Sequence, residues 1–216
     1  MRFKYYIFAS LMFVSFLFGN SAEGRSTIGS YWIGMGYSGY SDDLTDGDAF
    51  VIASNFPVHE NFDIGVSGHI GSLTVLDIDF LSYGISVDTK VHYKIPMGSV
   101  TIDPFFSVGI GLQSLESYTW QYVGSSYYYD YYQTVANSSV LVPYQFSIGS
   151  EFTFGEYFSL VPALGIRGIA NEDIDSIFCY GIQANFLVND HFSIGLSFEG
   201  TEESGKTFAV LGRYHL

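Results

Sequence analysis

Sulfur and positive charge are both scarce in this chain. Cysteine occurs once, at Cys179, which excludes a fold held together by intramolecular disulfides. Eight Lys and Arg residues stand against 22 Asp and Glu residues, and the formal net charge is −14 at pH 7. Because nucleic acid and anionic lipid surfaces attract proteins through basic side chains, this composition argues against both as bulk partners.

A long apolar run is also missing from most of the sequence. Past residue 20, no run approaches the roughly 20 consecutive apolar residues that a membrane-spanning helix requires. Hydrophobic residues nevertheless make up 48% of the chain and charged residues only 14%, so the apolar side chains are dispersed among polar ones. Aromatic residues reach 19%, a richness typical of membrane barrels with an aromatic girdle at each interface. Composition therefore favours a sheet that spans a membrane.

The first 22 residues have the pattern of a secretory signal peptide. Arg2 and Lys4 precede an apolar run over residues 5–18, and small residues follow up to Ala22. We expect residues 1–22 to be a cleaved signal peptide and residues 23–216 to form one barrel domain in the bacterial outer membrane. A single N-terminal membrane anchor is the alternative.

From Ile28 onward, apolar residues alternate with small or polar ones in a period of two, which predicts β-strands. Residues 192–199 show the pattern in its clearest form, with Phe and aliphatic residues on one face and Ser, Gly and Glu on the other. In a soluble sandwich the face opposite the core would be charged, whereas here it is mostly Gly and Ser. The pattern thus predicts an inside-out, closed antiparallel barrel that is all-β.

Segments between turn signals indicate about ten strands, an even number as bacterial barrels of one chain have. We place them near 28–39, 47–56, 62–71, 80–95, 100–114, 139–154, 157–169, 176–188, 191–200 and 206–216. An eight-stranded barrel with one miscounted hairpin is the alternative. Tight turns near residues 57–61, 96–99, 155–156 and 189–190 belong on the periplasmic side, so the longer, polar connections face outward.

The chain ends on an alternating strand, with Phe208, Val210, Tyr214 and Leu216 on one face. With this ending, the sequence resembles small outer-membrane barrels of the OmpA, OmpX and Ail type over essentially the whole mature chain. The resemblance implies that the barrel-assembly machinery reads the last strand. Two departures are Leu216, where the family usually has Phe or Trp, and ten strands instead of eight.

The outward connections are strongly acidic. They carry Asp42, Asp43, Asp46, Asp48, Asp77, Asp79, Glu116, Asp130, Glu172, Asp173, Asp175, Glu199, Glu202 and Glu203. Carboxylates at one rim repel one another and the phosphates of lipopolysaccharide unless cations screen them, which suggests association with divalent ions. Ordinary solvated loops are the alternative, since no EF-hand-like spacing is present.

The longest connection is rich in tyrosine. It holds Tyr118, Trp120, Tyr122, Tyr127, Tyr128, Tyr129, Tyr131 and Tyr132 among Ser, Gly and Gln. Tyr and Trp offer a large amphipathic contact area at low rotamer cost, so this segment is a candidate surface for host or neighbouring-cell molecules. Alternatively, the two flanking strands extend beyond the bilayer and bury these rings against each other or against lipopolysaccharide sugars.

Strand parity directs a further set of polar residues into the lumen. The set comprises Asp63, His69, Asp88, Lys90, His92, Lys94, Asp103, Glu151, Arg167, Glu199, Arg213 and His215. Unpaired charges there are costly, so we expect pairs between strands, such as Glu151 with Arg167, that hold or plug the barrel. A narrow polar pore is the functional alternative, although a barrel of ten strands has little free width.

Catalytic residues are weakly indicated. His191 and Ser193 form a His-x-Ser pair like that of lipid A deacylases, with Glu202 or Glu203 as an orienting carboxylate. The topology, however, puts those glutamates a full strand away from His191. The five histidines lack metal-ligand spacing, and we expect no cofactor and no enzyme activity. The sequence therefore favours a structural or surface-interaction protein of the outer membrane, with a narrow passive pore second and a lipid A-modifying enzyme third.

Overall fold

The computed structural model describes residues 28–42, 45–75, 78–125, 130–155, 157–172, 175–202 and 205–216. Its strands are β1 (Trp32–Ser41), β2 (Thr45–His59), β3 (Phe62–Val75), β4 (Ile78–His92), β5 (Ile95–Met97), β6 (Val100–Ser125), β7 (Asp130–Leu141), β8 (Pro143–Phe154), β9 (Phe158–Ile169), β10 (Ile177–Asn189), β11 (Phe192–Thr201) and β12 (Lys206–His215). Within these residues there is no helix of the length and apolarity needed to cross a membrane. The predicted signal peptide, residues 1–22, lies outside the described residues.

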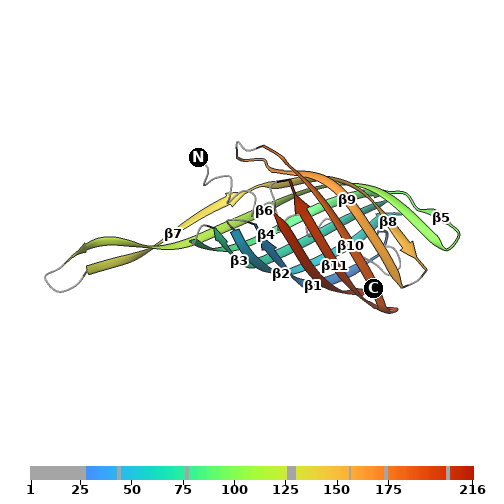
Figure 1. Ribbon diagram of the computed structural model, residues 1–216, viewed down its shortest axis with the longest axis horizontal. Coiled ribbons are helices and arrows are strands. Elements are labelled where there is room, and N and C mark those ends of the chain that lie inside the picture. The colour runs from blue at the N-terminus through green and yellow to red at the C-terminus, as the bar shows by residue number, and fades with distance from the viewer. Residues whose placement is uncertain are drawn as a thin grey trace.

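The strands form one closed antiparallel barrel (Figure 1). The first strand, β1, pairs with β2 on one side and with β12 on the other. The pairing of β1 with β12 runs over ten consecutive positions, from Trp32 with His215 to Ser41 with Lys206. Pairing of β4 with β6 completes the ring. The predicted all-β closed barrel is confirmed.

Two prolines explain why ten continuous strands carry twelve labels. The register of β4 against β6 continues into β5 without a shift across Tyr93 and Lys94. The Tyr93 amide donates to the Pro104 carbonyl at 3.2 Å, but proline has no N–H to return to the ladder. Pro143 likewise interrupts the ladder between the end of β7 and the start of β8. Both of these strands pair with β6 in one continuous register. Counted as continuous strands, the barrel has ten, and the eight-stranded alternative is wrong.

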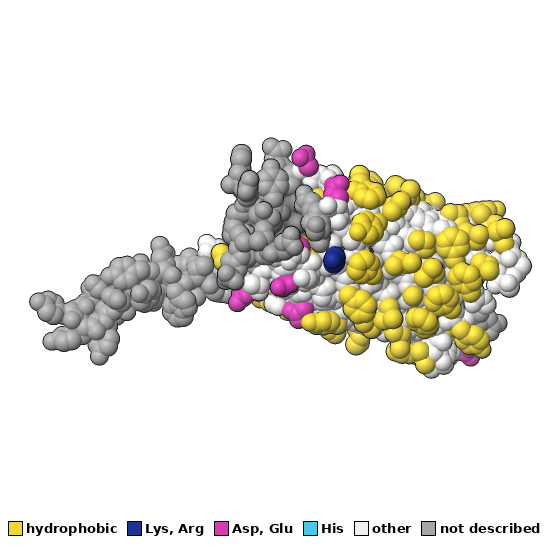
Figure 2. Space-filling model, in the orientation of Figure 1, with side chains coloured by type: hydrophobic (Ala, Val, Ile, Leu, Met, Phe, Trp, Pro, Cys, Tyr) yellow, Lys and Arg dark blue, Asp and Glu magenta, His cyan; other side chains and the backbone are white. Residues whose placement is uncertain are grey.

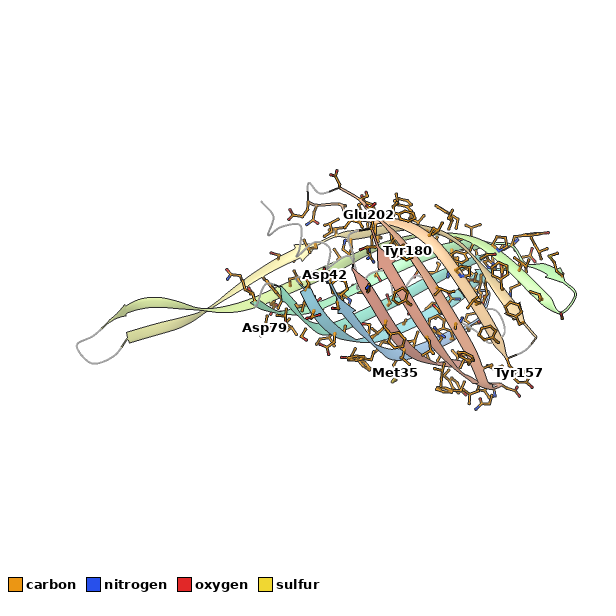
Figure 3. All side chains as sticks on the ribbon, in the orientation of Figure 1. Met35, Asp42, Asp79, Tyr157, Tyr180 and Glu202 are labelled. Carbon is orange, nitrogen blue, oxygen red and sulfur yellow. The ribbon has the colours of Figure 1, made fainter. Side chains whose placement is uncertain are left out.

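The outer wall is apolar and the interior polar, the reverse of a soluble protein. Ile33, Met35, Ile110 and Ile148 are each more than half exposed. Figure 2 shows such side chains covering most of the wall, with carboxylates gathered beyond the belt at one end. Figure 3 places Asp42, Asp79 and Glu202 toward that end and Tyr157 at the other. Tight turns lie at the Tyr157 end, so we call it the inner end and the opposite one the outer end.

Candidate functional site

Two features of the barrel are candidates for function. One is a strand pair that extends beyond the outer end, and the other is the lumen, which contains many polar side chains. The pairing of β4 with β6 stops at Ser117, but β6 continues to pair with β7 as far as Ser125 with Asp130. Beyond Ser117 the two strands therefore form a free two-stranded ribbon, residues 118–125 and 130–136, which projects far from the barrel in Figure 1.

This ribbon carries most of the tyrosine-rich segment. Tyr118, Trp120, Tyr122, Tyr131 and Tyr132 lie on its paired backbone, and Tyr122 is opposite Tyr132 in the register. Tyr127, Tyr128 and Tyr129 lie outside the described residues. The expected long connection is thus largely strand, and its strands run past the limits 114 and 139 that the sequence predicted. The alternative prediction was that the two flanking strands extend beyond the bilayer and bury these rings. The extension of the two strands is observed in the backbone.

The acidic rim is held partly by hydroxyl groups on the outer face of the wall. The carboxylate of Asp48 accepts hydrogen bonds from Tyr37 Oη at 2.8 Å and Ser72 Oγ at 2.5 Å. Tyr83 Oη donates to Glu116 Oε1 at 2.6 Å. These bonds fix carboxylates just above the apolar belt.

Five of the residues predicted at the rim are not observed there, because one is buried in the lumen and four lie outside the described residues. Glu199 is buried in the lumen, so its assignment to the rim was wrong. Asp43, Asp77, Asp173 and Glu203 lie outside the described residues. Among the residues that are described, no group of three or more His, Cys, Asp or Glu side chains is arranged to hold a metal ion.

The inner part of the lumen contains a histidine between two aspartates. His92 Nδ1 lies 3.2 Å from Asp103 Oδ1, and His92 Nε2 lies 3.7 Å from Asp63 Oδ1. Asp63 also accepts a hydrogen bond from Asn55 Nδ2 at 3.0 Å. All four side chains are buried. They come from β2, β3, β4 and β6, so the cluster joins four consecutive strands on the lumen side of the wall.

The outer part of the lumen contains an ion pair. Arg167 Nη1 on β9 lies 2.6 Å from Glu199 Oε1 on β11, with side chains only 1% and 4% exposed. Near the inner end of β12, Arg213 lies over the Trp32 ring at 5.4 Å and donates to Asn185 Oδ1 at 3.3 Å. Cys179 is fully buried on β10, the strand between the two members of the ion pair.

Most of the charged residues that strand parity directed into the lumen are buried. They include Asp88, Lys90, Asp103, Glu151, Arg167 and Arg213. Lys94 is exposed, because it sits in the break between β4 and β5, where it lies beside Gly29. The predicted pair of Glu151 with Arg167 is wrong: the register sets Arg167 opposite Gln145, well along β8 from Glu151, and Arg167 pairs with Glu199.

The weak catalytic candidate is not assembled. His191 lies in an exposed turn, where its ring stacks on Tyr214. Ser193 is buried and bonds instead to His215 Nε2 at 2.8 Å. Glu202 is at the opposite end of β11, where it accepts from the Phe178 amide at 3.1 Å. His191, Ser193 and Glu202 therefore do not form a triad.

Sequence reasoning missed one contributor to the lumen. Ile28 was expected to begin the first strand, but it precedes β1 and is fully buried in an apolar cluster with Phe105, Val161 and Ala163. The same parity argument that found the charges could not find Ile28, because a residue outside a strand has no assigned face.

No protein-family model and no curated protein matches the chain. Among solved structures, an outer membrane channel from Pseudomonas putida F1 is similar with a TM-score of 0.52 and 10% identity, covering 91% of this chain and 99% of that one. The translocator domain of autotransporter NalP from Neisseria meningitidis has a TM-score of 0.50 and 10% identity, covering 100% and 94%. Ail, the attachment invasion locus protein of Yersinia pestis, has a TM-score of 0.37 and 13% identity, covering 87% and 97%.

At these identities the similarity concerns the fold alone. It confirms the expected resemblance to outer-membrane barrels at the level of fold. The chain has the fold of β-barrels from bacterial outer membranes, and its apolar outer wall is that of a barrel that spans a membrane.

Proposed function

We propose that this barrel acts at the cell surface, and that the ribbon of residues 118–125 and 130–136 is its contact surface for molecules of a host or a neighbouring cell. The observation that carries the proposal is the continued pairing of β6 with β7 beyond the barrel. At about 3.3 Å per residue, eight further residues extend the ribbon by about 26 Å. That length lifts the contact surface clear of the rim.

The composition of the ribbon supports contact with a partner. By strand alternation, positions 118, 120, 122 and 132 share one face, and the sequence has Tyr or Trp at each of them. Aromatic residues of this kind dominate binding energy at many protein interfaces. Because the backbone is already paired, binding does not have to order it, which lowers the entropic cost of association.

The lumen gives a second reason to look outside the barrel for function. Buried ion pairs and hydrogen bonds occupy both its inner and outer parts, from the His92 cluster to the pair of Arg167 and Glu199. A barrel of this width is filled by its own side chains. We therefore propose a non-enzymatic, structural or adhesive role, with lipopolysaccharide and membrane lipid around the wall and the barrel-assembly machinery engaging β12 during insertion.

Removing the ribbon should abolish surface binding and leave the barrel intact. Ser117 and Asn137 face each other in the register, so they can be joined by an Asn-Gly turn in place of residues 118–136. We expect cells that display this variant to lose binding to epithelial monolayers and to neighbouring bacterial cells, as measured by retained cells after washing.

A matched variant keeps the ribbon and removes its aromatic side chains. It changes Tyr118, Trp120, Tyr122 and Tyr132 to Thr, a residue that strands accept readily, and it should lose most of the binding too. Undiminished binding by the shortened barrel would refute the proposal.

A narrow passive pore is the second candidate, favoured by the polar character of the lumen. Ser107, Ser147, Gln113 and Gln145 are polar residues of the wall and are all buried. The two candidates differ in conductance. For the unmodified protein in planar bilayers we expect only rare or very small single-channel currents, because buried pairs block the path. A steady, open-channel current from the folded protein would favour the pore.

A further inference from the structure

The segment ahead of β1 runs into the lumen. Ile28 is fully buried against Phe105 of β6 and Val161 and Ala163 of β9. Along the ring of continuous strands, β6 and β9 lie equally far from β1, one in each direction. Ile28 therefore reaches the side of the barrel opposite the strand that it precedes, and residues 28–30 cross the lumen.

The crossing segment is fixed by its backbone. The Gly29 amide donates to Asp63 Oδ2 at 2.7 Å, and the Ser30 carbonyl accepts from Asn55 Nδ2 at 2.9 Å. Gly29 has φ of +87°, a left-handed conformation that glycine adopts without strain. Two buried side chains of the wall thus hold the main chain of this segment.

The crossing segment ends before Tyr31. The Tyr31 carbonyl accepts a hydrogen bond from the Leu216 amide at 3.1 Å, which extends the ladder of β1 with β12 by one step. Tyr31 is also half exposed on the outside of the barrel. Tyr31 therefore belongs to the wall, and of the described residues ahead of β1, residues 28–30 lie inside it.

The charged groups around the segment belong to several strands. Asp63 of β3 also faces His92 of β4, which faces Asp103 of β6. A Cβ atom on Gly29 would lie 3.1 Å from Lys94 Nζ, so the lysine at the break between β4 and β5 lies against the same turn. Lys90 of β4 lies over the Phe105 ring at 5.0 Å, next to the cluster that holds Ile28.

We propose that residues 28–30 are a removable plug that seals the inner end of the lumen, and that withdrawing them admits water and small ions. The plug is held non-covalently, through one apolar side chain, backbone hydrogen bonds and the turn at Gly29. The strands of the wall can stay paired when it leaves, because residues 28–30 belong to no strand. Asp63 and Asn55, which lose their backbone partners when the segment leaves, are polar, and water can satisfy them. This property is independent of the ribbon.

A cysteine reporter beside Ile28 tests the plug. The native thiol is first removed by Cys179→Ser, and Val161→Cys then introduces a single thiol against Ile28. In this background we compare three chains in detergent micelles: the plug intact, Ile28→Glu, and a deletion of residues 23–30. The probe is a small, permanently charged methanethiosulfonate, and barrel folding is checked by the heat-dependent shift in gel mobility. Ile28→Leu is the matched control, since it keeps an apolar side chain of the same volume.

We expect the thiol introduced by Val161→Cys to be modified at least ten times faster in the deletion and Ile28→Glu variants than in the intact chain and in Ile28→Leu. If the deletion does not fold, Ile28→Glu still gives the answer, because it retains every backbone atom. Equal modification rates in folded intact and folded variant barrels would overturn the proposal, as would fast modification of the intact barrel.

Discussion

Replacing Glu199 with alanine should destabilise the barrel by about 3–5 kcal/mol, the usual cost of removing one partner from a buried ion pair. Arg167 would keep its charge in a site where its side chain is 1% exposed. The pair also reaches over β10, since Arg167 is opposite Ile177 and Glu199 opposite Gly181 on that strand. Its loss therefore affects three strands together.

The measurement is urea unfolding in phospholipid vesicles, followed by tryptophan fluorescence. Glu199→Ala, Arg167→Ala and the double variant Arg167→Met/Glu199→Leu are compared with the unchanged chain. The double variant buries no charge at this site, so we expect it to be close to neutral or more stable than the unchanged chain. A double variant as unstable as both single variants added together would show that the two side chains do not act as a pair.

An arginine in the middle of the outer wall should cost about 2–4 kcal/mol of stability, and one near its edge only about 0–1 kcal/mol. Ile148 lies at the middle of β8 and is 58% exposed, whereas Val58 lies next to the inner turn and is 62% exposed. In water, two such exposed sites would tolerate arginine equally. In a bilayer, only the central site forces the guanidinium into hydrocarbon.

Ile148→Arg and Val58→Arg form a matched pair for this test, read from urea midpoints in vesicles. In detergent micelles, where the charge reaches water more easily, the difference between them should shrink. If both variants lost the same stability in vesicles, the assigned membrane depth of β8 would be wrong.

Local pattern was enough to predict the strands and their faces. A period of two assigns every residue of a strand to the wall or the lumen, and the buried Asp103, Arg167 and Arg213 follow from it. Pairing inside the lumen needs more, because it depends on register and on which strands face each other across the interior. Strand parity alone therefore could not identify Glu199 as the partner of Arg167.

Two further errors concern residues outside the limits of the predicted strands. The segment between β6 and β7 was interpreted as a connection because its aromatic residues stand among Ser, Gly and Gln, yet the backbone ladder continues to Ser125 and Asp130. Ile28 was placed in the first strand, but it lies before that strand, where no period applies. The ribbon and the plug, which carry both functional proposals, thus lie outside the strands that sequence periodicity assigned correctly.

The pairing of β1 with β12 also sets the order of events in biogenesis. Trp32 of β1 pairs with His215 of β12. The first and last strands of the wall must therefore come together before the backbone groups at their free edges are hydrogen-bonded. Contacts this distant in sequence are slow to form, and until they do, both edges offer unpaired backbone groups to other chains. A nascent chain of this protein cannot complete its wall before its last strand is available. Closure of the wall is therefore a late step of folding.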